Sequence, residues 1–282
     1  MKGKICVVTG SNSGIGRETA LALAGMGATV VMAVRNQERG QKARTEIVDK
    51  TGNKATDMMI CDVSSKESIR NFVRTFTSKY NRLDVLINNA GAVFFKRQTT
   101  VDGFERMLAV DYLGPFLLTH ELLPLLKSSA PSRIVNVSSG LHKSGKVDLD
   151  DLQSEKSFDG MNVYLNAKLM LLMFTYVLAR RLEATGVTVN AVLPGFAATN
   201  LGKGGGSLRQ SIAFKLVRPM QISAKRGAET SVYLASSNEV KNVTGKCFFK
   251  KKETKTTPIS YDQELQERLW NKTIELLGLT SF

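Results

Sequence analysis

The chain has 282 residues, of which 43% are hydrophobic, 23% charged and 7% aromatic, a composition typical of a globular protein with a sizeable core. Its net charge of +14 favours anionic partners such as nucleic acid, anionic lipid or a phosphorylated cofactor, without choosing among them. Short apolar runs, a start unlike a signal peptide and three widely spaced cysteines exclude transmembrane, fibrous, disordered and disulfide-rich secreted proteins. We therefore expect a cytoplasmic protein with reduced thiols and no metal site.

Short apolar runs rich in β-branched residues alternate with longer helical stretches over most of the chain. The predicted strands span residues 5–9, 29–34, 56–60, 85–88, 134–138, 188–193 and 246–249. The predicted helices span residues 16–26, 37–51, 66–80, 103–127, 160–185 and 228–235. Because nearly continuous apolar strands are typical of parallel sheets buried on both faces, the pattern predicts a single α/β domain. We expect a Rossmann-type, doubly wound, seven-stranded parallel sheet flanked by helices.

Two regions interrupt this alternation. Residues 201–210 hold four glycines, and residues 211–220 mix apolar with basic side chains. A mobile substrate lid over about 196–225 would have such a sequence, and so would a loop followed by an ordinary surface helix. The tail at about 260–278 carries apolar residues at helical spacing, which predicts a C-terminal helix with one buried stripe.

The first predicted strand runs directly into a glycine-rich turn, TGSNSGIG, and a predicted helix follows. Gly10 allows a tight exit from the strand, Gly14 lets the backbone approach a pyrophosphate, and Gly16 lets helix and sheet pack closely. The start of the helix adds free N–H groups and the positive end of the helix dipole. A glycine cluster alone indicates only a turn, but in this position it predicts a nucleotide site. The candidate residues are Gly10, Ser11, Asn12, Ser13, Gly14, Ile15 and Gly16.

The end of the second predicted strand indicates which nucleotide is bound. An NAD site usually has Asp or Glu here for the ribose hydroxyls, but this chain has Arg35 and Asn36. A guanidinium binds a 2′-phosphate well, and Arg17 and Arg39 are further candidate partners. We therefore expect NADP(H) to be preferred, with NAD(H) still possible, although a solvated surface arginine would have the same sequence.

Two motifs in the second half of the chain carry residues suited to carbonyl and alcohol chemistry. Ser139 follows a predicted strand, and Tyr164 and Lys168 lie four residues apart on one face of a predicted helix. An ammonium beside a phenol lowers the phenol's pKa from about 10 toward the working range. The serine can hydrogen-bond the same substrate oxygen. Alone, such a Tyr–Lys pair would indicate a surface pair, but its order after the nucleotide-binding turn favours catalysis.

With these motifs the sequence resembles the short-chain dehydrogenase/reductase family over nearly its whole length. The matching motifs are Thr9–Gly16, Asp62-Val63, Asn88-Asn89-Ala90-Gly91, Ser139, Tyr164 with Lys168, and Pro194-Gly195. The stretches at 33–36, 132–139 and 268–278 make it most similar to the retinol-dehydrogenase-like reductases. The resemblance implies that Asp62 and Val63 lie by the adenine. It also implies that the cofactor is lined by Asn89, Ala90 and Gly91 and its nicotinamide flanked by Pro194 and Gly195.

The resemblance also implies a mechanism. Tyr164 would be the acid in carbonyl reduction or the base in alcohol oxidation, Lys168 would lower its pKa and bind the nicotinamide ribose, and Ser139 would hold the substrate oxygen. One catalytic position departs from the family pattern, because Asp111 stands where an asparagine usually supports a proton relay. We expect this carboxylate to pair with Lys168, raise the lysine's pKa and weaken its effect on Tyr164.

Together these features predict an NADP(H)-dependent oxidoreductase that interconverts an aldehyde or ketone with its alcohol. Phe94, Phe95, Phe196 and the predicted lid favour an apolar or retinoid-like small molecule as substrate. Asp111 keeps one alternative open, a catalytically weak pseudoenzyme that binds NADP(H) and acts through interactions.

Charge and apolar patterning also bear on macromolecular and membrane partners. The lysine run 250–252 beside two phenylalanines suits single-stranded nucleic acid, but no nucleic-acid motif accompanies it, so we expect no such partner. Retinol-dehydrogenase-like proteins often carry an N-terminal membrane anchor, whereas this sequence starts with a predicted strand. We expect a cytoplasmic location and leave open a peripheral membrane contact through 211–220 or the lysine run, and a homo-oligomer.

Overall fold

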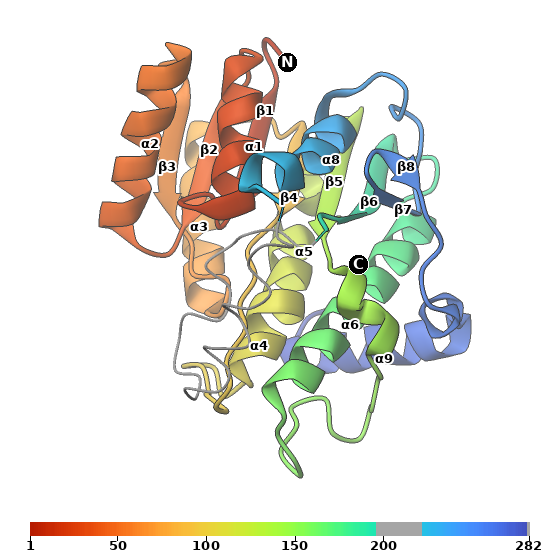
Figure 1. Ribbon diagram of the computed structural model, residues 1–282. Coiled ribbons are helices and arrows are strands. Elements are labelled where there is room, and N and C mark those ends of the chain that lie inside the picture. Colours follow the sequence, from red (N-terminus) through yellow and green to blue (C-terminus); the bar gives the residue numbers. More distant parts are fainter. Residues whose placement is uncertain (196–221, 281–282) are drawn as a thin grey trace.

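The computed structural model of the chain describes residues 1–195 and 222–280 (Figure 1). Its strands are β1 (Ile5–Thr9), β2 (Thr29–Val34), β3 (Thr56–Ile60), β4 (Val85–Asn88), β5 (Ser132–Val137), β6 (Val187–Leu193), β7 (Lys246–Phe249) and β8 (Lys252–Glu253). They form one sheet in the order β3-β2-β1-β4-β5-β6-β7-β8. The seven expected strands pair in parallel, and the two-residue β8 adds an antiparallel edge beside β7. The predicted single-domain, doubly wound α/β fold is therefore confirmed.

The longer helices of the described residues lie between the strands or after them. They are α1 (Gly14–Gly25), α2 (Gln37–Thr51), α3 (Lys66–Lys79), α5 (Gly114–Ser128), α6 (Gly160–Arg181), α8 (Ala224–Ser236) and α9 (Gln263–Leu277). The shorter elements are α4 (Arg106–Leu108), a π-helical turn η1 (Ala109–Leu113), and the 3₁₀ turns η2 (Gly140–Ser144) and η4 (Pro258–Tyr261). Most of the predicted lid, residues 196–221, falls outside the described residues.

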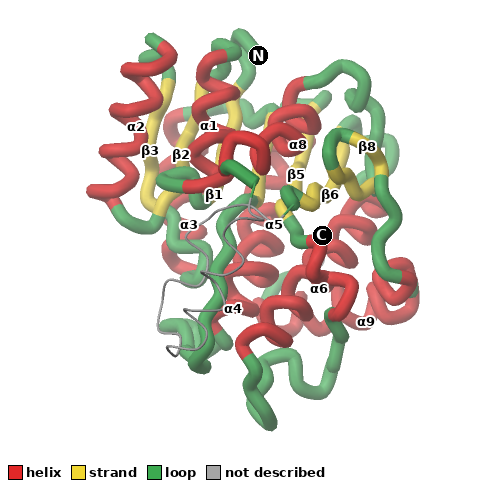
Figure 2. Tube along the Cα trace, in the orientation of Figure 1, coloured by secondary structure: helices red, strands yellow, loops and turns green. Residues whose placement is uncertain are grey.

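Helices cover both faces of the sheet, as Figure 2 shows. Val8 of β1 faces a core formed with α1, α2 and α8, whereas its neighbour Val7 faces a core formed with α3, α5, α6 and α9. Because successive side chains of a strand point to opposite faces, both must be apolar when both faces are covered. This explains why the strands are nearly continuous apolar runs.

Helix α6 is the core helix that later carries Tyr164 and Lys168. Of the described helices it alone is long and apolar enough to cross a bilayer, and 78% of its apolar window is buried inside the protein. The C-terminal helix α9 packs against α6 and α5: the Trp270 ring lies 5.9 Å from the Phe174 ring of α6 and 4.8 Å from the Phe116 ring of α5. Arg181 of α6 covers the same indole at 4.5 Å. Through these contacts α9 holds α6 in place.

The single helix predicted over 103–127 is wrong in detail, because the structure divides it into α4, η1 and α5. The Glu105 carboxylate accepts a hydrogen bond from the Leu108 N–H at 2.7 Å, so helical structure starts only at Arg106. Pro115 has no N–H to donate to the Asp111 carbonyl four residues earlier, which allows the wider π-helical turn before it. Gly114 also lies so close to the Val63 carbonyl that a Cβ would clash with it.

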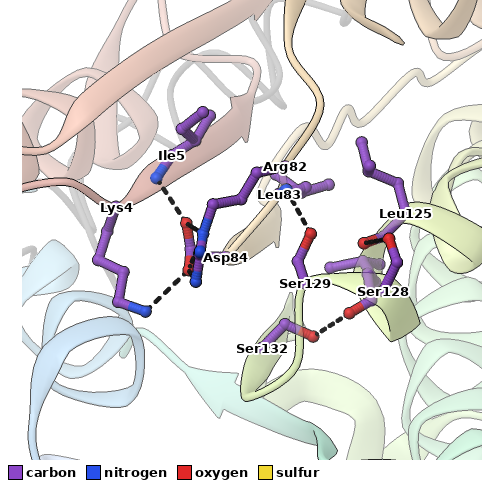
Figure 3. A network of polar contacts seen from close by, with 10 residues as sticks. Lys4, Ile5, Arg82, Leu83, Asp84, Leu125, Ser128, Ser129 and Ser132 are labelled. Carbon is purple, nitrogen blue, oxygen red and sulfur yellow. Dashed lines mark hydrogen bonds and ion pairs between the residues drawn. The ribbon is translucent and has the colours of Figure 1, made fainter.

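A polar network fixes the amino edge of the sheet (Figure 3). The buried Asp84 carboxylate accepts hydrogen bonds from Lys4 Nζ at 2.8 Å, from the Ile5 N–H at 2.9 Å and, through both oxygens, from the Arg82 guanidinium. Hydrogen bonds from these three donors lower the pKa of Asp84 below its ordinary value, although burial alone would raise it. The network ties the start of β1 to the start of β4, and so fixes the register of the central strands.

Candidate active site

The glycine-rich turn after β1 has the backbone that its sequence predicts. Gly10 and Gly14 have φ angles of +65° and +57°, which favour glycine over residues with a side chain. A Cβ on Gly10 would come within 2.9 Å of Ala90 Cα, and a Cβ on Gly16 would lie 2.5 Å from the Gly10 carbonyl oxygen. Both glycines therefore permit a close approach between the turn, α1 and the segment after β4.

Helix α1 starts without a capping side chain. Ser13 occupies its N-cap position but its side chain accepts no hydrogen bond from the helix, and the first turn holds no acidic residue. By contrast, the N-cap side chains of α2, α3, α6, α8 and α9 each accept a backbone N–H; these are Asn36, Ser65, Asp159, Ser223 and Asp262. The free N–H groups at the start of α1 are suited to an external anion such as a pyrophosphate.

Thr9 and Asn89 connect the turn to the end of β4. The Thr9 hydroxyl accepts the N–H groups of Asn89 and Ala90, each at 2.9 Å, and the Asn89 amide donates to the Thr9 carbonyl at 2.8 Å. These contacts hold two strand ends together at the carboxyl edge of the sheet, where ligands of doubly wound folds bind.

The end of β2 presents basic side chains to the same edge. Arg35 and Arg39 are exposed and line the cavity described below, and no ion pair within the described residues involves either. Asn36 also lines it, with its carboxamide oxygen accepting the Arg39 N–H at 2.8 Å. Arg17, a further candidate from the sequence, instead pairs with Glu18 and Glu46 at 3.0 and 3.2 Å. Two guanidinium groups thus remain available for an anion.

A cavity of about 350 Å³ runs along this edge and brings most of the sequence-predicted residues together. The predicted residues that line it are Gly10, Asn12, Ser13, Gly14, Ile15, Gly16, Arg35, Asn36, Asp62, Val63, Asn89, Ala90, Gly91, Tyr164, Lys168 and Pro194. Ser11, Asp111, Ser139 and Gly195 do not line it. Ser11 is fully buried and does not line the cavity, and its contact with a cofactor stays a prediction.

Tyr164 and Lys168 lie on the inner face of α6 at the end of the cavity away from Arg35. Lys168 Nζ lies 5.7 Å from the centre of the Tyr164 ring, and both side chains are buried. Burial raises the pKa of Tyr164 above its ordinary value; the Lys168 charge and a hydrogen bond with Ser139 oppose this rise, and the Asp111 charge adds to it. The phenol therefore holds its proton at neutral pH.

The structure pairs Asp111 with Lys168 inside the protein. Asp111 Oδ1 lies 2.9 Å from Lys168 Nζ, with the two side chains 0% and 4% exposed. The ammonium also donates to the Val137 carbonyl at 3.2 Å, and the carboxylate accepts the Ala92 N–H at 3.3 Å. Burial alone would lower the pKa of Lys168, but the Asp111 charge raises it above its ordinary value. The ammonium, whose residue lines the cavity, is thus paired with a carboxylate that does not line it.

Some site residues were missed at the sequence level. The Ser138 hydroxyl donates to the Lys168 carbonyl at 2.9 Å and ties the end of β5 to α6. Cys61, Ala92, Val93, Val110 and Val137 also line the cavity. Their positions at strand ends were a usable signal, because the carboxyl ends of neighbouring parallel strands meet at one edge.

Comparisons with known proteins agree with this geometry. A family model described as short chain dehydrogenase matches residues 4–207. Human retinol dehydrogenase 12 is 42% identical over 279 residues, which cover 99% of this chain and 88% of that protein. The chain belongs to the short-chain dehydrogenase family.

Other matches of this short-chain dehydrogenase agree in sequence and in fold. Human retinol dehydrogenase 14 is 42% identical over 300 residues, covering 99% of this chain and 88% of that protein. The crystal structure of an uncharacterized protein from Mycobacterium paratuberculosis superposes with a TM-score of 0.80 at 30% identity, covering 99% of this chain and 94% of that chain. The chain is therefore an oxidoreductase similar to the retinol dehydrogenases, as the sequence resemblance predicted.

Proposed function

We propose that this protein is an NADP(H)-dependent oxidoreductase that interconverts an apolar aldehyde or ketone with its alcohol. The observation that carries the proposal is the layout of one cavity. Its lining includes the free N–H groups at the start of α1, the exposed guanidinium groups of Arg35 after β2 and Arg39 at the start of α2, and a buried tyrosine–lysine pair from α6. A long anionic cofactor suits the first two features, and proton transfer suits the third.

The residues present fit a nicotinamide dinucleotide. Glycines whose Cβ atoms would clash and an uncapped helix start suit its pyrophosphate, while Arg35 and Arg39 suit a 2′-phosphate on its adenosine ribose. Asp62 and Val63 line the cavity beside this end, and Pro194 lines it as well. When bound, such a cofactor supplies or accepts a hydride.

In this proposal the side chains of α6 and β5 handle the proton. Tyr164 donates its proton to the carbonyl oxygen during reduction and takes it back from the alcohol during oxidation. Lys168 favours the phenolate by its charge, and Ser139, which hydrogen-bonds Tyr164, also holds the substrate oxygen. Because Tyr164 has a raised pKa, it is protonated near neutral pH, which favours carbonyl reduction.

The surroundings of Tyr164 support an apolar substrate. The tyrosine packs in a cluster with Val93, Met107, Val163 and Leu165, against which the half-buried Phe94 and Phe95 also pack. Such a wall offers dispersion contacts and few hydrogen-bond partners to the part of a substrate beside the reacting carbon. The two human relatives above are named for retinol, an apolar alcohol, and we extend that substrate class to this chain as part of the proposal.

The test is a fluorescence titration of the purified protein with NADPH and NADH, followed by turnover assays on a panel of aldehydes and ketones. We expect tighter binding of NADPH and its oxidation by apolar carbonyls. Tyr164→Phe should abolish turnover and leave NADPH affinity within about twofold, since only the hydroxyl is removed. Retained turnover in this variant would refute the role of Tyr164, and no binding of either cofactor would refute the proposal at its base.

One observation favours a second candidate, a pseudoenzyme that binds NADP(H). Asp111 partly neutralises the ammonium that should favour the Tyr164 phenolate. Tight NADPH binding without turnover across the whole panel would support this candidate. The expected cytoplasmic location, the contact of 211–220 with a membrane, and a homo-oligomer stay predictions.

A further inference from the structure

His142 is a buried histidine three residues after Ser139, and the mechanism above does not use it. Its side chain lies in η2, is 0% exposed and has two hydrogen-bond partners on different parts of the chain. Nδ1 lies 2.6 Å from the Ser139 carbonyl oxygen, and the Thr257 N–H donates to Nε2 at 3.4 Å. The ring therefore bridges the serine of the active site and the C-terminal segment.

These two partners assign the protonation of the ring. A backbone N–H can only donate, so the nitrogen that faces Thr257 must be the bare one. A carbonyl oxygen can only accept, so the nitrogen that faces Ser139 must carry the proton. Burial lowers the pKa of His142, which keeps this singly protonated ring stable near neutral pH.

The C-terminal partner is itself firmly held. The Ser260 hydroxyl donates to the Thr257 carbonyl at 2.6 Å and lies 2.6 Å from the Thr256 hydroxyl. Thr256 in turn contacts the Tyr176 hydroxyl of α6 at 2.8 Å. His142 is thus hydrogen-bonded to a segment, Thr256 to Ser260, that is itself hydrogen-bonded to the helix carrying Tyr164. We call this segment the anchor.

On the other side the ring holds the residue whose hydroxyl contacts Tyr164. The Ser139 backbone is extended, with φ −146° and ψ 146°, and its hydroxyl accepts the Leu141 N–H at 3.2 Å. Its carbonyl accepts both the His142 N–H at 3.2 Å and the ring. Fixing the carbonyl fixes the Ser139 backbone, and with it the position of the Cβ from which the hydroxyl reaches Tyr164.

We infer that His142 is a positioning residue for Ser139, which it holds against the anchor at Thr256, Thr257 and Ser260. The inference rests on the proposed function, because it gives Ser139 its role toward the substrate oxygen. His142 touches neither cofactor nor substrate in this account and acts through the serine.

Two matched variants of His142 distinguish the contact with Ser139 from the contact with Thr257. The amide of asparagine reaches about as far as Nδ1, so His142→Asn can still donate to the Ser139 carbonyl; the amide of glutamine reaches Nε2, so His142→Gln keeps only the Thr257 contact. We expect His142→Asn to keep kcat within about threefold of the wild type. His142→Gln should lose about tenfold in kcat, the worth of one hydrogen bond, with NADPH affinity unchanged.

Equal losses in both variants, in step with equal losses of melting temperature, would show a merely structural histidine and overturn the inference. A greater loss in His142→Asn would overturn it as well, because Thr257 would then be the partner that matters. A second measurement needs neither variant to fold nor the enzyme to turn over.

Nitrogen-15 NMR of the wild-type imidazoles reads the tautomer directly. The chain has 2 histidines, so a His120→Gln variant assigns the signals. We expect a neutral His142 with the proton on Nδ1 at pH 7, and a proton on Nε2 would overturn the geometry on which the inference stands. If the wild type has no turnover but the Nδ1 tautomer is found, the proposed function fails and the hydrogen-bonded bridge remains.

Discussion

Replacing Asp111 by asparagine removes one charge from the buried pair with Lys168 and leaves the shape of the side chain almost unchanged. Lys168 Nζ lies 5.7 Å from the Tyr164 ring centre. If the ring centre is taken as the mean position of the phenolate charge, the two charges attract by about 3 kcal/mol at an effective dielectric constant of about 20, which lowers the phenol's pKa by about two units. The Asp111 carboxylate, 2.9 Å from the ammonium, cancels part of this effect.

If the Asp111 carboxylate cancels half of the effect of Lys168 on the Tyr164 pKa, then Asp111→Asn lowers that pKa by about one unit. Alcohol oxidation needs the deprotonated tyrosine, so its rate rises with pH through this pKa. In the pH profile of kcat/KM for oxidation, the rising limb should therefore shift to lower pH by about one unit. At any pH well below this limb, oxidation should be about tenfold faster than in the wild type. The falling limb for carbonyl reduction should move down by the same amount.

The assay is the pH profile of kcat/KM in both directions, with the apolar alcohol and carbonyl that the substrate panel selects. Asp57→Asn is a matched control, because Asp57 pairs with Lys79 at 2.6 Å on the surface and does not line the cavity. An oxidation limb that stays in place or moves up in Asp111→Asn would refute the reasoning. A collapse of turnover in a folded variant would show that the carboxylate itself is required.

Three further substitutions test the cofactor site and the fold. Arg35→Asp should weaken NADPH binding by about 10–100-fold, because a charged hydrogen bond is worth about 1.5–3 kcal/mol. It should also reverse the cofactor preference, measured as the ratio of the NADPH and NADH dissociation constants. An unchanged ratio would contradict the assignment of Arg35 to the 2′-phosphate. Gly16→Ala should abolish cofactor binding in titrations, since its Cβ would lie 2.5 Å from the Gly10 carbonyl oxygen, and wild-type affinity would contradict the close packing. Asp84→Asn should lower the free energy of unfolding at pH 7 by about 1–3 kcal/mol in denaturant titrations. The pKa of Asp84 is lowered in the folded state, so this difference should shrink as pH falls below about 4, and a difference independent of pH would contradict it.

Much of the fold could be predicted because the strands are buried on both faces. Burial on both faces requires an apolar residue at nearly every position, and this made the bounds of β1, β2 and β4 readable from the sequence alone. The location of the cavity could also be predicted, because the glycine-rich turn and the motifs after β4 and β5 all lie at the carboxyl ends of strands. Helix α9 was predictable from one apolar stripe.

The parts that could not be predicted depend on contacts distant in the chain. Nothing near His142 in sequence shows that Thr257, 115 residues later, donates to its ring. Ser11 belongs to the glycine-rich motif, but only the packed structure shows its side chain pointing inward. The ion pair of Arg17 with Glu46 joins two helices, and only the folded chain shows it.

The π-helical turn η1 unites two departures from expectation that looked separate in the sequence. One is the break in the helix expected over 103–127, and the other is the carboxylate at position 111. A π-helical turn inserts a residue relative to an α-helix, which re-aims the side chains on either side of it. Here Val110 lines the cavity while Asp111 lies behind its wall against Lys168. The backbone that Pro115 and Gly114 permit therefore places beside Lys168 a charge that adds to the rise in the pKa of Tyr164. Asp111→Asn thus probes the local fold and the chemistry together.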